Sequence, residues 1–148
     1  MELKNVVNHY KTLLTGEKFY VTGSLAMAYI GLCEFNVVND LDIVIVNPTD
    51  ECVNILNRLV EEHPSKITSS PGSKLRMFMH DKTKIDVFLV KETSRTIPSG
   101  DGFDISTIEC IVKAKKSYNR LKDWTQLWNI GQKFCTHEEL MTAVSKCK

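Results

Sequence analysis

The chain has 148 residues, of which 43% are hydrophobic and 25% are charged, and its formal net charge at pH 7 is +1. These values are ordinary for one globular domain and argue against a strongly basic nucleic-acid binder, although they are compatible with a local basic patch. No apolar run approaches the roughly 20 residues of a membrane helix, and the chain does not open on a secretory signal. The five cysteines are scattered without a Cys-x-x-Cys pair, which is typical of a reduced cytoplasmic protein. We therefore expect one cytoplasmic domain over residues 1–148, without membrane contact.

Apolar spacing and turn residues predict alternating helices and strands in the first half of the chain. Gly16 closes the first helix, and Gly23-Ser24 breaks the first strand just before the second helix. The expected elements are a helix over 2–15, a strand over 19–21, a buried helix over 25–33, a strand over 41–46 and a helix over 50–62.

The second half is predicted to be a strand pair followed by helices. Thr136 and Glu139 form a capping-box pattern that opens the last helix. The expected elements are a polar turn over 69–73, strands over 75–80 and 84–90 around a turn at 81–83, a loop over 93–104 and helices over 105–120 and 122–132. The pattern indicates an α/β (α+β) fold in which a small mixed β-sheet, core about 17–92, is flanked by helices and followed by a helical C-terminal part, about 105–148.

Three aspartates interrupt otherwise apolar strands. Asp40 and Asp42 are two residues apart, so both carboxylates project from the same side of one strand. Two like charges side by side are costly unless a cation sits between them, and Mg²⁺ or Mn²⁺ takes such oxygen ligands together with the phosphates of a nucleotide. If the strand that carries Asp86 pairs beside the first, three carboxylates can hold the metal ions of a phosphoryl-transfer site.

A phosphate-binding turn is predicted at Gly23-Ser24. Glycine lets the backbone approach a phosphate, and the helix that follows offers free N–H groups and the positive end of its dipole. Three basic residues are candidates for contacting the triphosphate: Lys74 and Arg76, which follow the polar turn, and Lys113, which lies among apolar neighbours on a predicted helix.

Each of these signals has an ordinary structural explanation when it is taken alone. A Gly-Ser pair before a helix is usually a cap, an Asp-x-Asp pair is often at the surface, and Asp86 could simply pair with Lys84. The four histidines have no metal-ligand spacing, and Trp124 and Trp128 are four residues apart on one helical face, which is typical of core packing. The order and placement of the turn and the three aspartates are much more specific than any single member.

The order Gly23-Ser24, fifteen residues, Asp40-Leu41-Asp42 and a distant Asp86 resembles the signature of the DNA polymerase beta-like nucleotidyltransferase superfamily. The stretch 23–32, rich in Ala and Gly, and the later run 112–116 with Lys122-Asp123 are similar to the AbiEii-like toxin group of bacteria and phages. The resemblance covers about residues 17–128. It implies a nucleotidyltransferase-like fold and transfer of a nucleoside monophosphate, with Asp40, Asp42 and Asp86 as catalytic and metal-binding residues.

Two departures from the group leave a second function open. The stretch 35–39 lacks the arginine that often precedes the aspartate pair, and Gln126 stands where relatives often carry a second aspartate. The first function is a metal-dependent nucleotidyltransferase that uses a nucleoside triphosphate and an acceptor hydroxyl on RNA, protein or a small molecule. The alternative is a catalytically weakened nucleotide-binding module that serves as an antitoxin, sensor or assembly subunit and acts on a protein partner.

Overall fold

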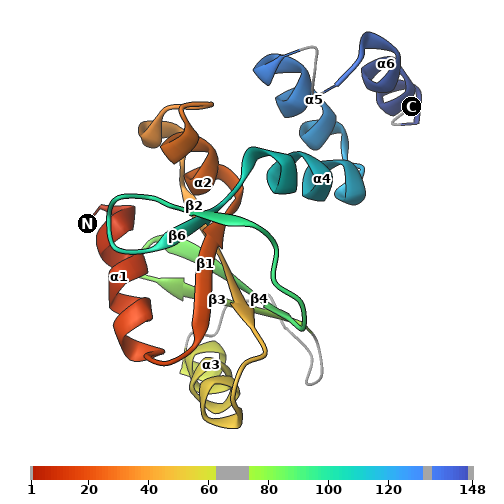
Figure 1. Ribbon diagram of the computed structural model, residues 1–148. Helices are drawn as coiled ribbons and strands as arrows, with labels where there is room; N and C mark the ends of the chain where they lie inside the picture. The colour runs from red at the N-terminus through yellow and green to blue at the C-terminus, as the bar shows by residue number, and fades with distance from the viewer. Residues whose placement is uncertain (1, 63–73, 132–134, 147–148) are drawn as a thin grey trace. The chain divides into compact units, whose positions relative to one another are not determined.

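The computed structural model describes residues 2–62, 74–131 and 135–146 (Figure 1). The chain divides into two compact units, Met1–Thr107 and Ile108–Lys148. The first unit contains α1 (Leu3–Leu13), β1 (Lys18–Thr22), α2 (Gly23–Ile30), the 3-10 helix η1 (Phe35–Val37), β2 (Asp40–Val46), α3 (Asp50–Glu62), β3 (Leu75–His80), β4 (Thr83–Val90), β5 (Thr96–Pro98) and β6 (Asp104–Ser106). The second unit contains α4 (Ile108–Tyr118), α5 (Leu121–Ile130) and α6 (His137–Lys146). The expected α/β class, with a mixed sheet and a helical C-terminal part, is confirmed.

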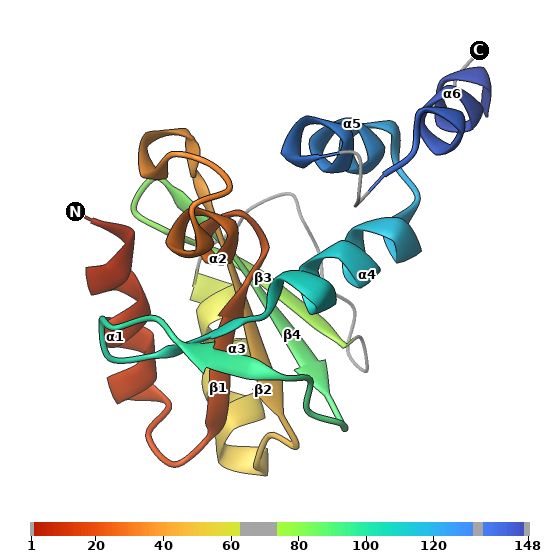
Figure 2. The same ribbon diagram turned by 45° about the horizontal axis from the view of Figure 1, so that its top comes forward.

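The sheet of the first unit has six strands in the order β3-β4-β2-β1-β6-β5 (Figures 1 and 2). β1 pairs antiparallel with β2, β3 with β4, and β5 with β6, whereas β4 runs parallel to β2 and β6 runs parallel to β1. Parallel pairing places the first residues of β2 and β4 at the same edge of the sheet. This edge is where the aspartates of both strands lie.

One face of the sheet forms the main core. Tyr10 of α1 packs on Phe78 with ring centroids 5.5 Å apart, and the Tyr10 hydroxyl lies 2.8 Å from His80 Nδ1. From α3, Asn57 accepts a hydrogen bond from Arg76 on the same face. The central strands contribute side chains at most 1% exposed to this face: Val21, Leu41, Ile43, Ile45, Ile85 and Val87. The amphipathic helices α1 and α3 therefore cover the apolar face, and the opposite face is the one that carries the aspartates.

Several expected elements end or begin elsewhere than the sequence suggests. The helix expected over 25–33 ends at Ile30, because Gly31 takes a left-handed conformation (φ 89°) that stops it. The segment expected as a loop over 93–104 contains β5 and the first residue of β6, and the helix expected from 105 begins at Ile108. These strands are three residues long; β6 pairs with β1 and β5 pairs with β6, so no local periodicity marks them. The polar turn predicted at 69–73 lies outside the described residues.

In the second unit, a buried charge network joins α4 to α5. Asp123 is 1% exposed and accepts hydrogen bonds from Arg120 Nε at 2.7 Å and Nη2 at 3.0 Å. Lys115 Nζ lies 4.0 Å from Asp123 Oδ1 and donates to Gln126 Oε1 at 2.6 Å. The predicted capping box at the start of α6 is present, since Glu139 N donates to Thr136 Oγ1 and Thr136 N donates to Glu139 Oε1.

Replacing Asp123 by alanine is expected to destabilise the helical unit by about 2 kcal/mol, because Lys115 loses its carboxylate while Arg120, which is half exposed, is partly compensated by solvent. Hydrogen exchange of α4 and α5 amides measures the loss. Lys122→Ala, an exposed change on the same helix, should leave that exchange unaltered; equal protection in both variants would show that the network contributes nothing.

None of the helices in the described part of the chain is both long enough and apolar enough to cross a membrane.

Candidate functional site

Strand pairing brings the three predicted aspartates together on one face of the sheet. Asp42 is the direct partner of Asp86, and Asp40 is the direct partner of Lys84. Paired residues on neighbouring strands project to the same face, so four charged side chains occupy the corners of one patch. We call these four residues, Asp40, Asp42, Lys84 and Asp86, the aspartate patch.

Asp86 is a poorly solvated member of the patch. Its side chain is 16% exposed, Lys84 Nζ lies 3.8 Å from its Oδ2, and its Oδ1 is buried without a hydrogen-bond partner. Burial raises the pKa of Asp86; the ammonium of Lys84 lowers this pKa, the charge of Asp40 raises it, and a hydrogen bond with Asp42 lowers it, with a net rise. A buried carboxylate oxygen with no partner is costly, and binding of a further cation or hydrogen-bond donor would remove that cost.

The backbone beside the patch fits the predicted phosphate turn. Gly23 has a φ of 68°, and a Cβ at this position would collide with Asp42 Oδ2 and come within 3.0 Å of Asp42 Cγ. The glycine therefore lets the first turn of α2 approach the carboxylate. Thr22, at the N-cap of α2, makes no side-chain cap hydrogen bond, and backbone amides at a helix start are groups that bind phosphate oxygens. Ser24 is the second residue of the same turn.

The donor atoms suit a hard divalent cation that arrives with other ligands. Among residues 2–62, 74–131 and 135–146, no group of three or more His, Cys, Asp or Glu side chains is already arranged to hold a metal ion. Mg²⁺ typically uses one or two carboxylates and completes its shell with phosphates and water, so a closed protein cage is not required. The unpartnered Oδ1 of Asp86 and the oxygen-only donor set fit such an ion.

Of the three predicted basic residues, Arg76 does not join the patch. Arg76 is 6% exposed, donates from Nε to Asn57 Oδ1 at 2.7 Å, and lies on the opposite face of the sheet, because Met77 and not Arg76 pairs with Asp86. Lys74 is exposed just before β3. Lys113 is exposed on α4 in the second unit.

Two lysines that the sequence analysis did not select make specific contacts. Lys84 lies in the aspartate patch itself. Lys115, and not Lys113, is the buried lysine of α4, and it contacts Gln126 and Asp123. Its position four residues after the buried Ile111 was the available signal, since residues four apart share a helix face.

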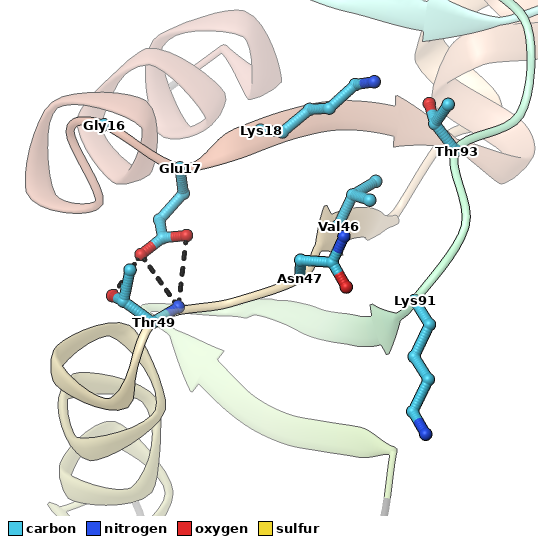
Figure 3. Close-up of a pocket in the computed structure, with 8 residues that line it drawn as sticks. All are labelled: Gly16, Glu17, Lys18, Val46, Asn47, Thr49, Lys91 and Thr93. Atoms are coloured by element: carbon cyan, nitrogen blue, oxygen red, sulfur yellow. Dashed lines mark hydrogen bonds between the residues drawn. The ribbon is translucent and has the colours of Figure 1, made fainter.

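A cavity at the other end of the strands is a separate feature (Figure 3). Glu17 accepts a hydrogen bond there from Thr49 N at 3.2 Å, while Lys18 and Lys91 point in different directions. Val46 of its lining is at the far end of β2 from Asp40, about 20 Å along the strand. The diverging lysines do not form a phosphate cradle, so the aspartate patch is the stronger candidate site.

Comparisons with known proteins give structural likeness without a family. No protein-family model matches the chain, and no curated protein matches it. Among solved structures, the chain is similar to an antigenic nucleotidyltransferase-like protein from Paracoccidioides brasiliensis, with 18% identity over 99% of this chain and 87% of that chain and a TM-score of 0.48. Similarity at this level does not identify a function, so any assignment depends on the chain's own residues.

Proposed function

We propose that the chain is a magnesium- or manganese-dependent nucleotidyltransferase that moves a nucleoside monophosphate from a nucleoside triphosphate to an acceptor hydroxyl. The observation that carries this proposal is the aspartate patch with its unpartnered Asp86 oxygen, beside a glycine that lets a helix N-terminus approach Asp42. The carboxylates suit a cation, and the start of a helix suits the phosphate anion that such a cation accompanies.

Each residue of the patch has a distinct role in this chemistry. Asp40 is exposed and Asp42 half-buried at the start of β2, so both are placed to hold the cation. When bound, the ion supplies positive charge to the transferring phosphoryl group. The first turn of α2, with Gly23 and Ser24, orients the triphosphate. Asp86, whose pKa is raised by burial, is suited to hold the proton of the acceptor hydroxyl.

Lys74, Arg76 and Lys113 remain predictions as nucleotide contacts, and Arg76 requires a change of conformation to serve as one. The acceptor classes that fit a hydroxyl nucleophile are RNA, protein and small molecules. The AbiEii-like resemblance adds a toxin role in a toxin–antitoxin pair as a finer proposal.

A second function is favoured by one contact in the helical unit. Gln126 accepts a hydrogen bond from Lys115 Nζ at 2.6 Å. The lysine is thus paired with an amide at the position where the resemblance implies a carboxylate. A neutral amide cannot take up a proton as a carboxylate does. This contact favours a nucleotide-binding module that serves as an antitoxin, sensor or assembly subunit.

Nucleotide binding should require the divalent ion. In calorimetry we expect ATP or another nucleoside triphosphate to bind at least tenfold more tightly with Mg²⁺ than with EDTA, because the patch repels a triphosphate that carries no cation. Asp40→Asn should remove most of this difference. The exposed aspartate Asp104 on β6 provides a matched control, and Asp104→Asn should behave as the unaltered protein. Equal affinity with Mg²⁺ and with EDTA would count against the metal site.

The two functions separate in a transfer assay. We expect α-labelled nucleoside triphosphates to label an RNA, protein or small-molecule fraction of cell extract when Mg²⁺ is present. Magnesium-dependent nucleotide binding without label in any fraction would favour the binding module.

A further inference from the structure

The aspartate patch contains its own cation. Lys84 is the direct partner of Asp40 across the β2–β4 pair and shares a face with Asp86 on its own strand. Neighbouring positions across the strands are about 4.8 Å apart and positions two residues apart along a strand about 6.6 Å apart, so the lysine begins at one corner of a small rectangle that three carboxylates complete. Its ammonium is therefore within reach of the space between those carboxylates.

The ion pair that Lys84 makes is loose. Lys84 Nζ lies 3.8 Å from Asp86 Oδ2, which is too long for a hydrogen bond and leaves Coulomb attraction as the main contribution. The ammonium leaves Oδ1 of the same carboxylate without any partner. One monovalent group faces three carboxyl groups in the patch, and it leaves Oδ1 of Asp86 without a hydrogen-bond partner.

The lysine is also free to leave. Its side chain is 33% exposed, whereas that of Asp86 is 16% exposed. A long, flexible side chain whose ammonium keeps access to water loses little when it moves outward. Asp86 cannot follow it, because this carboxylate is set in the central strand β4. The two side chains therefore differ in mobility, and Lys84 is the one that can move away when the pair separates.

We propose that Lys84 is an exchangeable counter-cation of the aspartate patch: its ammonium pairs with Asp86 in the metal-free protein and moves to solvent when a divalent cation binds. This inference rests on the proposed metal-dependent function and adds a regulation of that site. The lysine stabilises the metal-free patch and, by competing for Asp86, weakens its affinity for divalent ions. Such an arrangement limits binding of the bare ion and favours the ion that arrives with a triphosphate, whose own negative charge attracts the displaced ammonium.

The first test measures Mn²⁺ binding without nucleotide, from the electron paramagnetic resonance signal of the free ion. Lys84→Gln is expected to bind Mn²⁺ roughly tenfold more tightly than the unaltered protein, because a unit charge close to a divalent ion repels it on this scale. Lys84→Arg keeps the charge and should restore the original affinity. Lys82→Gln, which removes an exposed lysine from the turn of the same hairpin, should change nothing. Unchanged or weaker Mn²⁺ binding by Lys84→Gln would overturn the proposal.

The second test uses no metal. In EDTA, Lys84→Gln should lower the Tm by about 3 °C, since the patch loses its only cation, and adding Asp86→Asn to the same protein should reverse this loss. Absence of this coupling would contradict the pairing of Lys84 with Asp86. Coupling in EDTA together with no Mn²⁺ binding by any variant, with or without a nucleotide analogue, would instead overturn the metal-dependent function and leave Lys84 as a permanent partner of Asp86.

Discussion

Asp86→Asn is expected to reduce nucleotidyl transfer by a hundredfold or more, which is the scale on which removing one preorganised electrostatic group acts. Asparagine keeps the shape of the side chain but can neither carry the charge nor hold the acceptor proton. Nucleotide affinity in the presence of Mg²⁺ should fall far less than transfer, because Asp40 and Asp42 still hold the ion. Single-turnover transfer and calorimetry on the same samples separate the two quantities. Full activity of the variant would show that Asp86 has no part in the reaction.

The same substitution has a pH signature in the metal-free protein. Because burial raises the pKa of Asp86, the folded chain takes up a proton at this carboxyl at a higher pH than the unfolded chain does. The charged carboxyl therefore destabilises the fold at neutral pH, and this cost is relieved as the pH falls through the raised pKa. In EDTA, Asp86→Asn should be more stable than the unaltered protein at pH 7 by up to about 1 kcal/mol, and the difference should shrink on acidification.

Gly23→Ala is the second substitution with a large expected effect. A methyl group at this position would collide with Asp42 Oδ2, and the left-handed φ of 68° is unfavourable for alanine. We expect a stability loss of about 1–3 kcal/mol and a fall in transfer of about a hundredfold, because Asp42 has to move away from the start of α2. Chemical denaturation and the transfer assay measure the two effects.

Gly16→Ala provides a matched control for backbone strain. Gly16 has a φ of 93° but no atom lies within 4 Å of the position that its Cβ would take. This variant should therefore show a stability loss of about 1 kcal/mol and normal transfer. If Gly23→Ala loses no more activity than Gly16→Ala, then contact between Asp42 and the first turn of α2 is unimportant. The double variant Gly23→Ala with Asp42→Ala should regain part of the lost stability but no activity.

Much of the aspartate patch follows from strand periodicity. Asp40 and Asp42 share a face because residues two apart on a strand always do, and Asp86 joins them once β4 pairs with β2. The pairing itself is a tertiary event, which the sequence allowed but did not establish. The sequence did not indicate β5 and β6, because three-residue strands are too short to show periodicity; β6 depends on pairing with β1, and β5 on pairing with β6.

The placement of Arg76 could have been deduced from the hairpin turn. His80 pairs with Thr83 around a two-residue turn, and counting back along both strands sets Met77 opposite Asp86. Arg76 is one residue before Met77 and therefore faces the other side of the sheet, toward the apolar core. There its guanidinium donates a hydrogen bond to Asn57 Oδ1. Charge alone made the arginine a candidate for a phosphate contact, whereas the register places its side chain on the apolar face of the sheet. Burial of Lys115 in place of Lys113 has the same origin, a helix face set by Ile111.

The parallel pairing of β2 and β4 has a consequence for the order in which the protein folds. β1 and β2 can form as neighbours early, and so can the β3–β4 hairpin, but Asp42 and Asp86 meet only when these two pieces dock across the whole of α3 and the segment after it. The chain also loses loop-closure entropy at this docking step. The carboxylates therefore begin to repel one another only late in folding, after most local structure has formed. The aspartate patch is thus assembled by long-range contacts, and fragments that end before β4 contain the Asp-Leu-Asp strand but cannot build the patch.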